Sequence, residues 1–110
     1  MIRRISHAQF IALCQYVTQE VEKDGGKPVV LAIADEAGDI VYMSHMDNTP
    51  PRSGKIASGK AFTAAKMERT TTALLQFCQD SGTTLDAFVI PGMTTMPGGT
   101  PIVSKDGEPM

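Results

Sequence analysis

The chain has 110 residues, a length typical of one domain, so we expect a single domain over residues 1–110. Its net charge of −2 gives no overall attraction to nucleic acid or to an anionic membrane, and no apolar run approaches the roughly 18 residues of a membrane span. No continuous apolar signal core follows the charged N-terminus. We therefore expect a cytoplasmic protein that binds neither nucleic acid nor membrane.

Residues 6–24 have the pattern of an amphipathic helix. Ser6 and Gln9 have the spacing of a capping box, in which each side chain bonds the backbone N–H of the other residue. The paired glycines Gly25–Gly26 are typical of a helix end. The apolar residues that recur at helical spacing are Phe10, Leu13, Cys14, Val17 and Val21.

Residues 27–46 predict an antiparallel hairpin. The run 27–34 is almost continuously apolar and rich in β-branched residues, which is typical of a strand covered on both faces. Residues 35–39 carry turn chemistry, and residues 40–46 form a second strand. The strands must be antiparallel because a parallel crossover needs a dozen or more residues.

Two helices are expected next. Ser53 can cap a helix over residues 54–68, and Thr71 or Thr72 can cap a shorter helix that ends at residues 80–82. Cys14 and Cys78 lie among apolar helical positions and fit no zinc spacing, so we expect buried free thiols. The first of these helices carries a stripe of small residues that permits close packing on a sheet: Ala57, Ala61, Ala64 and Ala65.

The last part of the chain predicts two more strands. Residues 85–90 read as a third strand, residues 91–101 as a long loop, and residues 102–104 as the start of a fourth. Residues 105–107 mark a hairpin turn, and the chain stops as the return arm begins. The order α-β-β-α-α-β-β predicts an α+β domain with a mostly antiparallel sheet flanked by helices.

Charge is uneven along the chain. Residues 51–69 carry five basic side chains and one acidic side chain, a net +4, and acidic segments lie on either side. One interpretation is a solvated helix face, and the other is a local site for a phosphate or a carboxylate. Lys60 lies within this segment.

The loop over residues 93–101 is the most site-like stretch. Paired glycines, Gly98 and Gly99, can expose backbone N–H groups and let a ligand approach closely, and the hydroxyl of Thr100 adds a donor. A long loop inside a small domain is often functional, although a plain connection between strands is the alternative.

His45 is the more informative of the two histidines. Strand alternation places it on one face of its strand with Met43, and Met46 on the other face. A neutral imidazole among methionines could serve as an axial haem ligand, and a purely structural histidine is the alternative. Standard catalytic motifs are absent, which favours a binding protein over an enzyme.

Four segments together carry a resemblance to a known family. They are residues 30–39, the run His45-Met46-Asp47, residues 59–65 and the run Pro97-Gly98-Gly99-Thr100-Pro101-Ile102. In order and spacing the chain resembles the GlcG/HbpS-like family, the haem-degrading HbpS type, which also supplies the C-terminal domain of PduO-type cobalamin adenosyltransferases. His45 stands where the family usually has arginine.

The resemblance implies a profilin-like α/β sandwich, homo-oligomers, and in some members a bound haem or corrinoid such as cobalamin. It also implies a link to glycolate, glycerol or diol metabolism. Family members normally continue through a glycine-rich strand and a final helix, and this sequence lacks both. Three interpretations are open: the domain is C-terminally shortened, a partner chain fills the gap, or this variant folds differently.

The leading hypothesis is a haem- or tetrapyrrole-binding accessory protein. Lys60 would meet the haem propionates, His45 would be the axial metal ligand, and the backbone of Gly98, Gly99 and Thr100 would form part of the pocket. One alternative is an oligomeric accessory or structural subunit of a metabolic enzyme system, with no cofactor. Another is an enzyme acting on a small molecule, a short hydroxy acid or aldehyde.

Overall fold

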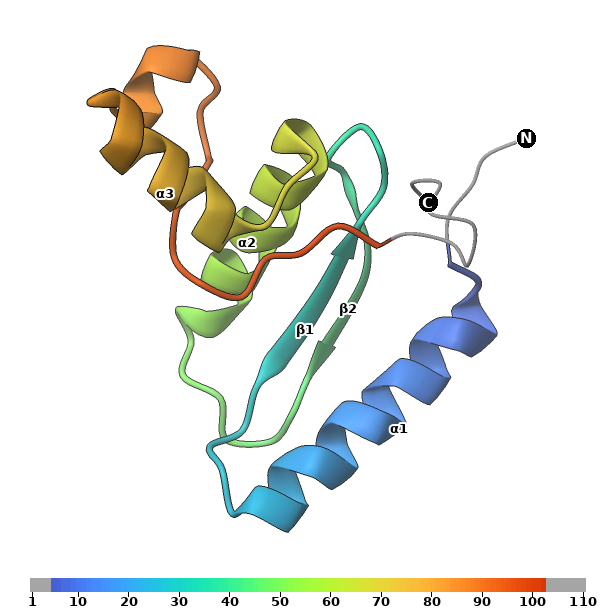
Figure 1. The fold of residues 1–110 in the computed structure, drawn as a ribbon. Coiled ribbons are helices and arrows are strands. Elements are labelled where there is room, and N and C mark those ends of the chain that lie inside the picture. Colours follow the sequence, from blue (N-terminus) through green and yellow to red (C-terminus); the bar gives the residue numbers. More distant parts are fainter. Residues whose placement is uncertain (1–4, 103–110) are drawn as a thin grey trace.

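A two-stranded antiparallel hairpin lies between two long helices (Figure 1). The structure is a computed structural model of the chain, and it describes residues 5–102. In chain order its elements are α1 (His7–Asp24), β1 (Val30–Ala34), β2 (Ile40–His45), α2 (Ser53–Met67), α3 (Thr71–Ser81) and the 3₁₀ helix η1 (Leu85–Phe88). This arrangement confirms the predicted α+β class with an antiparallel sheet flanked by helices.

The turn between β1 and β2 is held by Asp35. Its carboxylate accepts hydrogen bonds from the N–H groups of Ala37 and Asp39, both at 3.0 Å, and its own N–H donates to the Asp39 carbonyl at 2.8 Å. Gly38 follows with φ of +92°, a conformation that glycine adopts without a steric penalty. The predicted hairpin is therefore confirmed, with strands a few residues shorter than expected.

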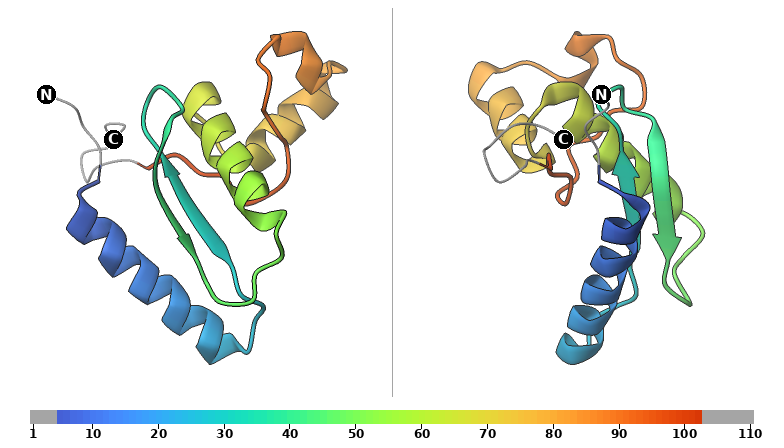
Figure 2. Two further views of the ribbon diagram at one scale, coloured as in Figure 1. Left: turned by 180° about the vertical axis from the view of Figure 1, so that it is seen from behind. Right: turned by 90° about the vertical axis from the view of Figure 1, so that its right-hand side faces the viewer.

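Helix α1 covers one face of the hairpin (Figures 1 and 2). The Phe10 ring stacks on the Tyr42 ring at a centroid distance of 4.9 Å, and the Tyr42 hydroxyl donates to the Ile5 carbonyl at 3.2 Å. Ile5, Phe10 and Ile33 are buried together as the core on this face. Both hydrogen bonds of the predicted capping box at Ser6 are present, and Gly25 ends the helix in the left-handed conformation.

Helix α2 covers the other face, where its small residues let it approach closely. Ala64 is 2% exposed and Thr63 is fully buried. The Thr63 hydroxyl donates to the Gly59 carbonyl at 2.7 Å and accepts from the Thr94 N–H at 2.9 Å, so it joins the helix to the following loop. The predicted cap at Ser53 is wrong, because the helix begins at Ser53 itself and the preceding Arg52 makes no side-chain cap.

Helix α3 begins one residue earlier than expected. The Thr70 hydroxyl, rather than that of Thr71 or Thr72, accepts from the Ala73 N–H at 3.0 Å and caps the helix. Thr71 is instead fully buried in the helix's first turn, where it contacts the loop over residues 93–101. Both cysteines are free, Cys78 buried and Cys14 half-buried, so burial is confirmed for Cys78 alone.

The predicted third strand is wrong. Residues 85–88 form the 3₁₀ helix η1, and Val89 follows in the left-handed region with φ of +58°. The apolar character of this segment predicted a strand, but none of the strands within residues 5–102 pairs with it. Local bonds instead close the turn, from the Ala87 N–H to the Thr84 carbonyl and from the Val89 N–H to the Asp86 carbonyl. Of the predicted fourth strand, Ile102 is not in a strand, and residues 103–104 and the hairpin at 105–107 lie outside the described residues.

Over residues 5–102, none of the helices is both long enough and apolar enough to cross a bilayer.

The Thr63 hydroxyl is predicted to stabilise the fold. In Thr63→Val the Thr94 N–H loses its side-chain acceptor in a half-buried position. We expect the free energy of unfolding to fall by about 1 to 3 kcal/mol, measured by chemical denaturation. The control is Ser58→Ala, because the Ser58 hydroxyl donates only to the Gly54 carbonyl of its own helix. A Thr63→Val variant as stable as the unchanged protein would contradict this assignment.

Candidate functional site

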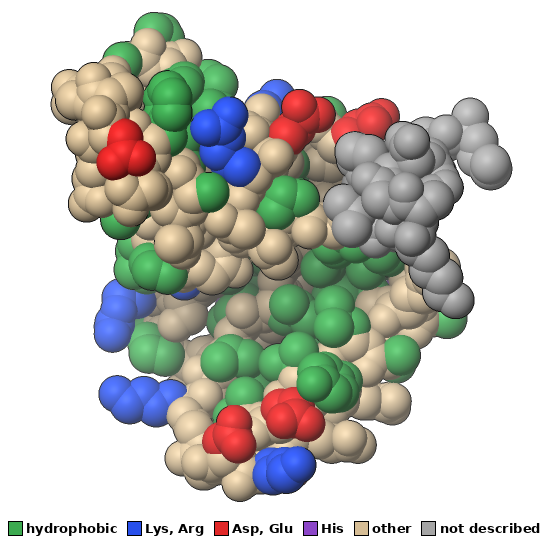
Figure 3. Space-filling model, in the orientation of Figure 1, with side chains coloured by type: hydrophobic (Ala, Val, Ile, Leu, Met, Phe, Trp, Pro, Cys, Tyr) green, Lys and Arg blue, Asp and Glu red, His purple; other side chains and the backbone are tan. Residues whose placement is uncertain are grey.

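A large cleft follows the edge of β1 that does not pair with β2. Its volume is about 1320 Å³. Figure 3 shows hydrophobic side chains gathered in the hollow between α1 and the part of the molecule that holds α2 and α3. The residues that line the cleft come from the segment before α1 and α1 itself (Ile5, Gln9, Leu13), from β1 and its ends (28–36), from α2 and the residue after it (Ser53, Ile56, Ala57, Lys60, Ala61, Ala64, Ala65, Glu68) and from the segment Met96, 98–102.

The charged groups of this mainly apolar cleft lie in two places, on the middle of α2 and at one end of the cleft. Lys60 contributes a cation from the middle of α2, and Asp35, Glu36 and Glu68 contribute carboxylates. These acids lie at one end, because the last turns of α2 lie over the β1–β2 turn, where a Cβ at Gly38 would lie 3.1 Å from the Lys66 side chain. The cleft therefore has an acidic end and a central lysine.

Four of the candidate site residues, Lys60, Gly98, Gly99 and Thr100, line this cleft. The glycines serve a different purpose from the one expected. The Gly99 N–H donates to the Thr71 hydroxyl at 3.0 Å, and the Gly99 carbonyl accepts from the Thr71 N–H at 3.0 Å. The Gly99 backbone is thus occupied within the protein and is not free to bind a ligand.

Gly99 is required here by close packing. A Cβ at this position would lie 2.6 Å from the Lys60 carbonyl oxygen and 2.7 Å from the Thr71 methyl group. Gly98 adopts a φ of +120°, and the Lys60 side chain lies directly against it. The paired glycines therefore fix the loop against α2 and α3 and hold the Lys60 side chain at the cleft.

His45 lies apart from the other predicted site residues. It is exposed on β2, and its Nε2 lies 3.3 Å from the Met43 sulfur. Its ring also contacts the start of α2, where a Cβ at Gly54 would lie 2.9 Å from its Cε1. It does not line the cleft, so one chain does not bring His45 and Lys60 into one pocket.

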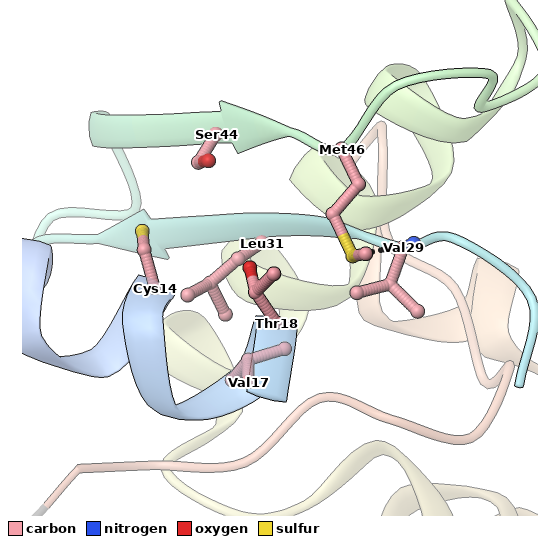
Figure 4. A pocket seen from close by; sticks show the side chains of 7 residues that line it. All are labelled: Cys14, Val17, Thr18, Val29, Leu31, Ser44 and Met46. Carbon is pink, nitrogen blue, oxygen red and sulfur yellow. Dashed lines mark hydrogen bonds between the residues drawn. The ribbon is translucent and has the colours of Figure 1, made fainter. Parts of the chain in front are cut away.

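Side chains alternate along β2 as predicted: His45 and Met43 lie on one face, and Ser44 and Met46 lie on the other. Ser44 and Met46 point toward α1, where they line a small pocket with Cys14 (Figure 4). The Met46 sulfur accepts from the Val29 N–H at 3.5 Å. The volume of this pocket is about 10 Å³, the room for about one water molecule, so it is no ligand site.

Met96 is a cleft residue that the sequence reasoning did not single out. It lies in the loop before Gly98 and its side chain is 48% exposed. A thioether is a soft ligand for iron or copper, and a methionine within a site-like loop is the signal that could have identified it. Among residues 5–102, no three or more His, Cys, Asp or Glu side chains gather where they could hold a metal ion.

Comparison with known proteins gives a consistent result. A family model described as haem-degrading protein HbpS-like matches residues 5–110. The protein GlcG of Escherichia coli strain K12 is 34% identical over 91 residues, which cover 82% of this chain and 65% of GlcG. This chain therefore spans slightly less than two thirds of that relative.

Solved structures share the fold. A double mutant of HbpS from Streptomyces reticuli matches 99% of this chain and 71% of its own, with a TM-score of 0.80 and 27% identity. A structure described as a PduOC–haem complex matches 96% of this chain and 76% of its own, with a TM-score of 0.78. At 24% identity the latter is evidence for the fold alone.

The packing of Gly99 is predicted to be intolerant of any side chain. In Gly99→Ala the added Cβ would meet backbone and a buried threonine, neither of which can move freely. We expect a loss of about 1 to 3 kcal/mol in the free energy of unfolding, measured by chemical denaturation. Gly26→Ala is the matched control, because a Cβ there meets nothing closer than 3.8 Å. Equal stability of the two variants would show that the loop does not pack as described.

Proposed function

Because the chain belongs to the haem-degrading HbpS-like family, we propose that it binds haem in the cleft along β1. The observation that carries the proposal is an apolar cleft of about 1320 Å³ with one lysine in its lining. Ligand pockets are mostly apolar, with volumes of roughly 300 to 1,000 Å³ and a few placed polar groups, so this cleft has room for a large flat ligand.

The residues that line the cleft fit the chemical groups of haem. Alanine, valine, leucine and isoleucine side chains suit the porphyrin, and the Lys60 ammonium suits a propionate carboxylate. The Met96 thioether is the soft donor that the cleft offers to iron. When bound, haem would supply a redox-active iron, and the part of this chain would be to hold it and exclude water.

The role of His45 as the axial ligand stays a prediction. An imidazole is a good ligand for haem iron, and the Met43 sulfur beside it adds a second soft donor. Haem bound through His45 would lie at the end of β2 near the start of α2 and outside the cleft. The two locations give different results in the titration below.

Several finer expectations accompany this proposal. Cobalamin as the ligand, a homo-oligomeric state, a cytoplasmic location and a link to glycolate, glycerol or diol metabolism are predictions from the family resemblance. We favour an accessory binding role over catalysis, and a cofactor-free accessory subunit is the alternative. A haem spectrum that bleaches with time when both a reductant and dioxygen are supplied would favour degradation instead.

Titration of the chain with haem tests the proposal. We expect a shift of the Soret band that saturates with added haem, and no shift at micromolar haem would refute haem binding. We expect Lys60→Ala to weaken the affinity about two- to fivefold, the scale of a partly exposed ion pair. Lys55→Ala is the matched control, because Lys55 is exposed on the same helix outside the cleft.

The axial ligand is identified with two further variants. We expect Met96→Leu to change the position of the Soret band, because leucine keeps the volume but removes the sulfur. Met93→Leu is its control, since Met93 lies in the same loop outside the cleft. A band that is unaffected by Met96→Leu but lost in His45→Ala would place the haem at His45 instead.

A further inference from the structure

Two soft metal donors lie beside each other near the end of β2, outside the cleft. The Nε2 atom of His45 lies 3.3 Å from the sulfur of Met43. The two residues are two positions apart on one strand, so their side chains leave the same face of the hairpin. Both side chains are exposed, Met43 at 38%, so a small solute can reach them from outside the protein.

Neighbouring residues leave room for this pair. Across the hairpin Met43 is paired with Ala32, whose methyl group takes little of the space on that face. At the start of α2, a Cβ on Gly54 would lie 2.9 Å from the His45 Cε1, 3.4 Å from its Nε2 and 4.0 Å from the Met43 sulfur. The imidazole and the thioether therefore both lie against Gly54, where the lack of a side chain makes space for them.

The spacing of the two donor atoms suits one metal ion bound by both. Typical metal bonds are about 2.0 Å to an imidazole nitrogen and about 2.3 Å to a sulfur. With those lengths, donors 3.3 Å apart make an angle of about 100° at the ion, close to a tetrahedral angle. The same spacing suits an Nε2–H···S hydrogen bond, so a proton and a metal ion are the two candidates for the space between the atoms.

The chemistry of the donors selects the ion. A thioether suits Cu(I) and zinc, and an imidazole suits zinc, copper, iron and nickel, so copper and zinc are common to both. Neither donor carries a negative charge that would neutralise a divalent ion. The His45 ring also contacts the first turn of α2, where the partial positive charge of a helix N-terminus disfavours a divalent ion more than a monovalent one. Cu(I) is the ion that meets these conditions.

We propose that Met43 and His45 bind one Cu(I) ion through the Met43 sulfur and the His45 Nε2. The imidazole then carries its proton on Nδ1, which leaves the Nε2 lone pair for the metal. Because the site is exposed and supplies two donors, the ion exchanges with soft ligands from solution. Neither residue lines the cleft, so Cu(I) binding here is independent of haem binding there.

Titration with Ag(I), a substitute for Cu(I) that stays monovalent in air, tests the proposal. NMR follows the methionine methyl groups and the imidazole ring protons of the haem-free chain. Because the free thiols of Cys14 and Cys78 also bind soft ions, the double variant Cys14→Ala, Cys78→Ala is titrated in parallel. We expect the Met43 methyl group and the His45 ring protons to shift together and to saturate at one ion per chain in that variant.

The unchanged chain keeps the test valid if the double variant does not fold. There we expect the same two side chains to shift together once the thiols are filled. Resonances of Met43 and His45 that do not move, or of which only one moves, would show that the contact is a hydrogen bond and would overturn the proposal.

Removal of each donor measures its part in Cu(I) affinity, which is determined without oxygen by competition with a coloured Cu(I) chelator. We expect Met43→Leu and His45→Ala each to weaken the affinity at least about tenfold. Met46→Leu is the matched control for the thioether, because Met46 is next to His45 in the chain but lies on the other face of β2. His7→Ala is the control for loss of an exposed imidazole. Equal losses in the controls would overturn the assignment of the two ligands.

A change at Gly54 tests the geometry with both donors kept. In Gly54→Ala the added Cβ displaces the His45 ring, which can turn away from Met43 without disturbing the fold. We expect Cu(I) affinity to fall at least about threefold. Gly59→Ala is the control on the same helix, because a Cβ there meets nothing closer than 3.6 Å. Unchanged affinity in Gly54→Ala would show that the spacing of the pair does not make the site.

Zinc tests the choice of a monovalent ion. We expect Zn(II) to produce no saturating shift of the Met43 and His45 resonances at the concentrations at which Ag(I) saturates them. Zn(II) that binds as tightly as Ag(I) would overturn the assignment of Cu(I). The Soret titration judges haem binding in the cleft separately, so failure of either titration leaves the other unaffected.

Discussion

The placement of β1 between two helices is the constraint on which the rest of the structure depends. This short strand pairs with β2 on one edge, packs against α1 on one face and lies under α2 on the other. Its side chains therefore build both layers of the core. Within residues 5–102 β2 is the strand that pairs with β1, and the opposite edge of β1 lines a large cleft.

Small residues make this placement possible. The alanine stripe of α2 lets the helix approach the sheet, and Gly99 lets the following loop approach α2 and α3. Two threonines, Thr63 and Thr71, then bond the loop backbone from buried positions. Gly98 and Gly99 pack against Lys60 of α2, and this packing holds the Lys60 side chain at the cleft.

Local chemistry explains which elements were predictable. The capping box at Ser6, the Asp35 turn and the glycine helix ends are each determined by residues within about four positions, and these predictions were confirmed. The segment 85–90 was predicted wrongly because a strand depends on a partner elsewhere in the chain. In the described part of the chain no strand pairs with this segment, and local i→i+3 bonds form a 3₁₀ helix. The cap of α3 differed by one residue because neighbouring threonine hydroxyls offer the same bond, whereas α2 begins after Arg52 without a side-chain cap.

The sequence by itself determined the fold class, the order of the first five elements and the family, because periodicity, caps and short-range motifs carry that information. It also selected Lys60 and residues 98–100, which the structure brings together at one cleft. Only the tertiary structure decided that His45 lies outside this cleft, that Met96 lies in it, and that Gly99 packs against the protein. These facts depend on distances between segments far apart in the chain, and no local pattern encodes such distances.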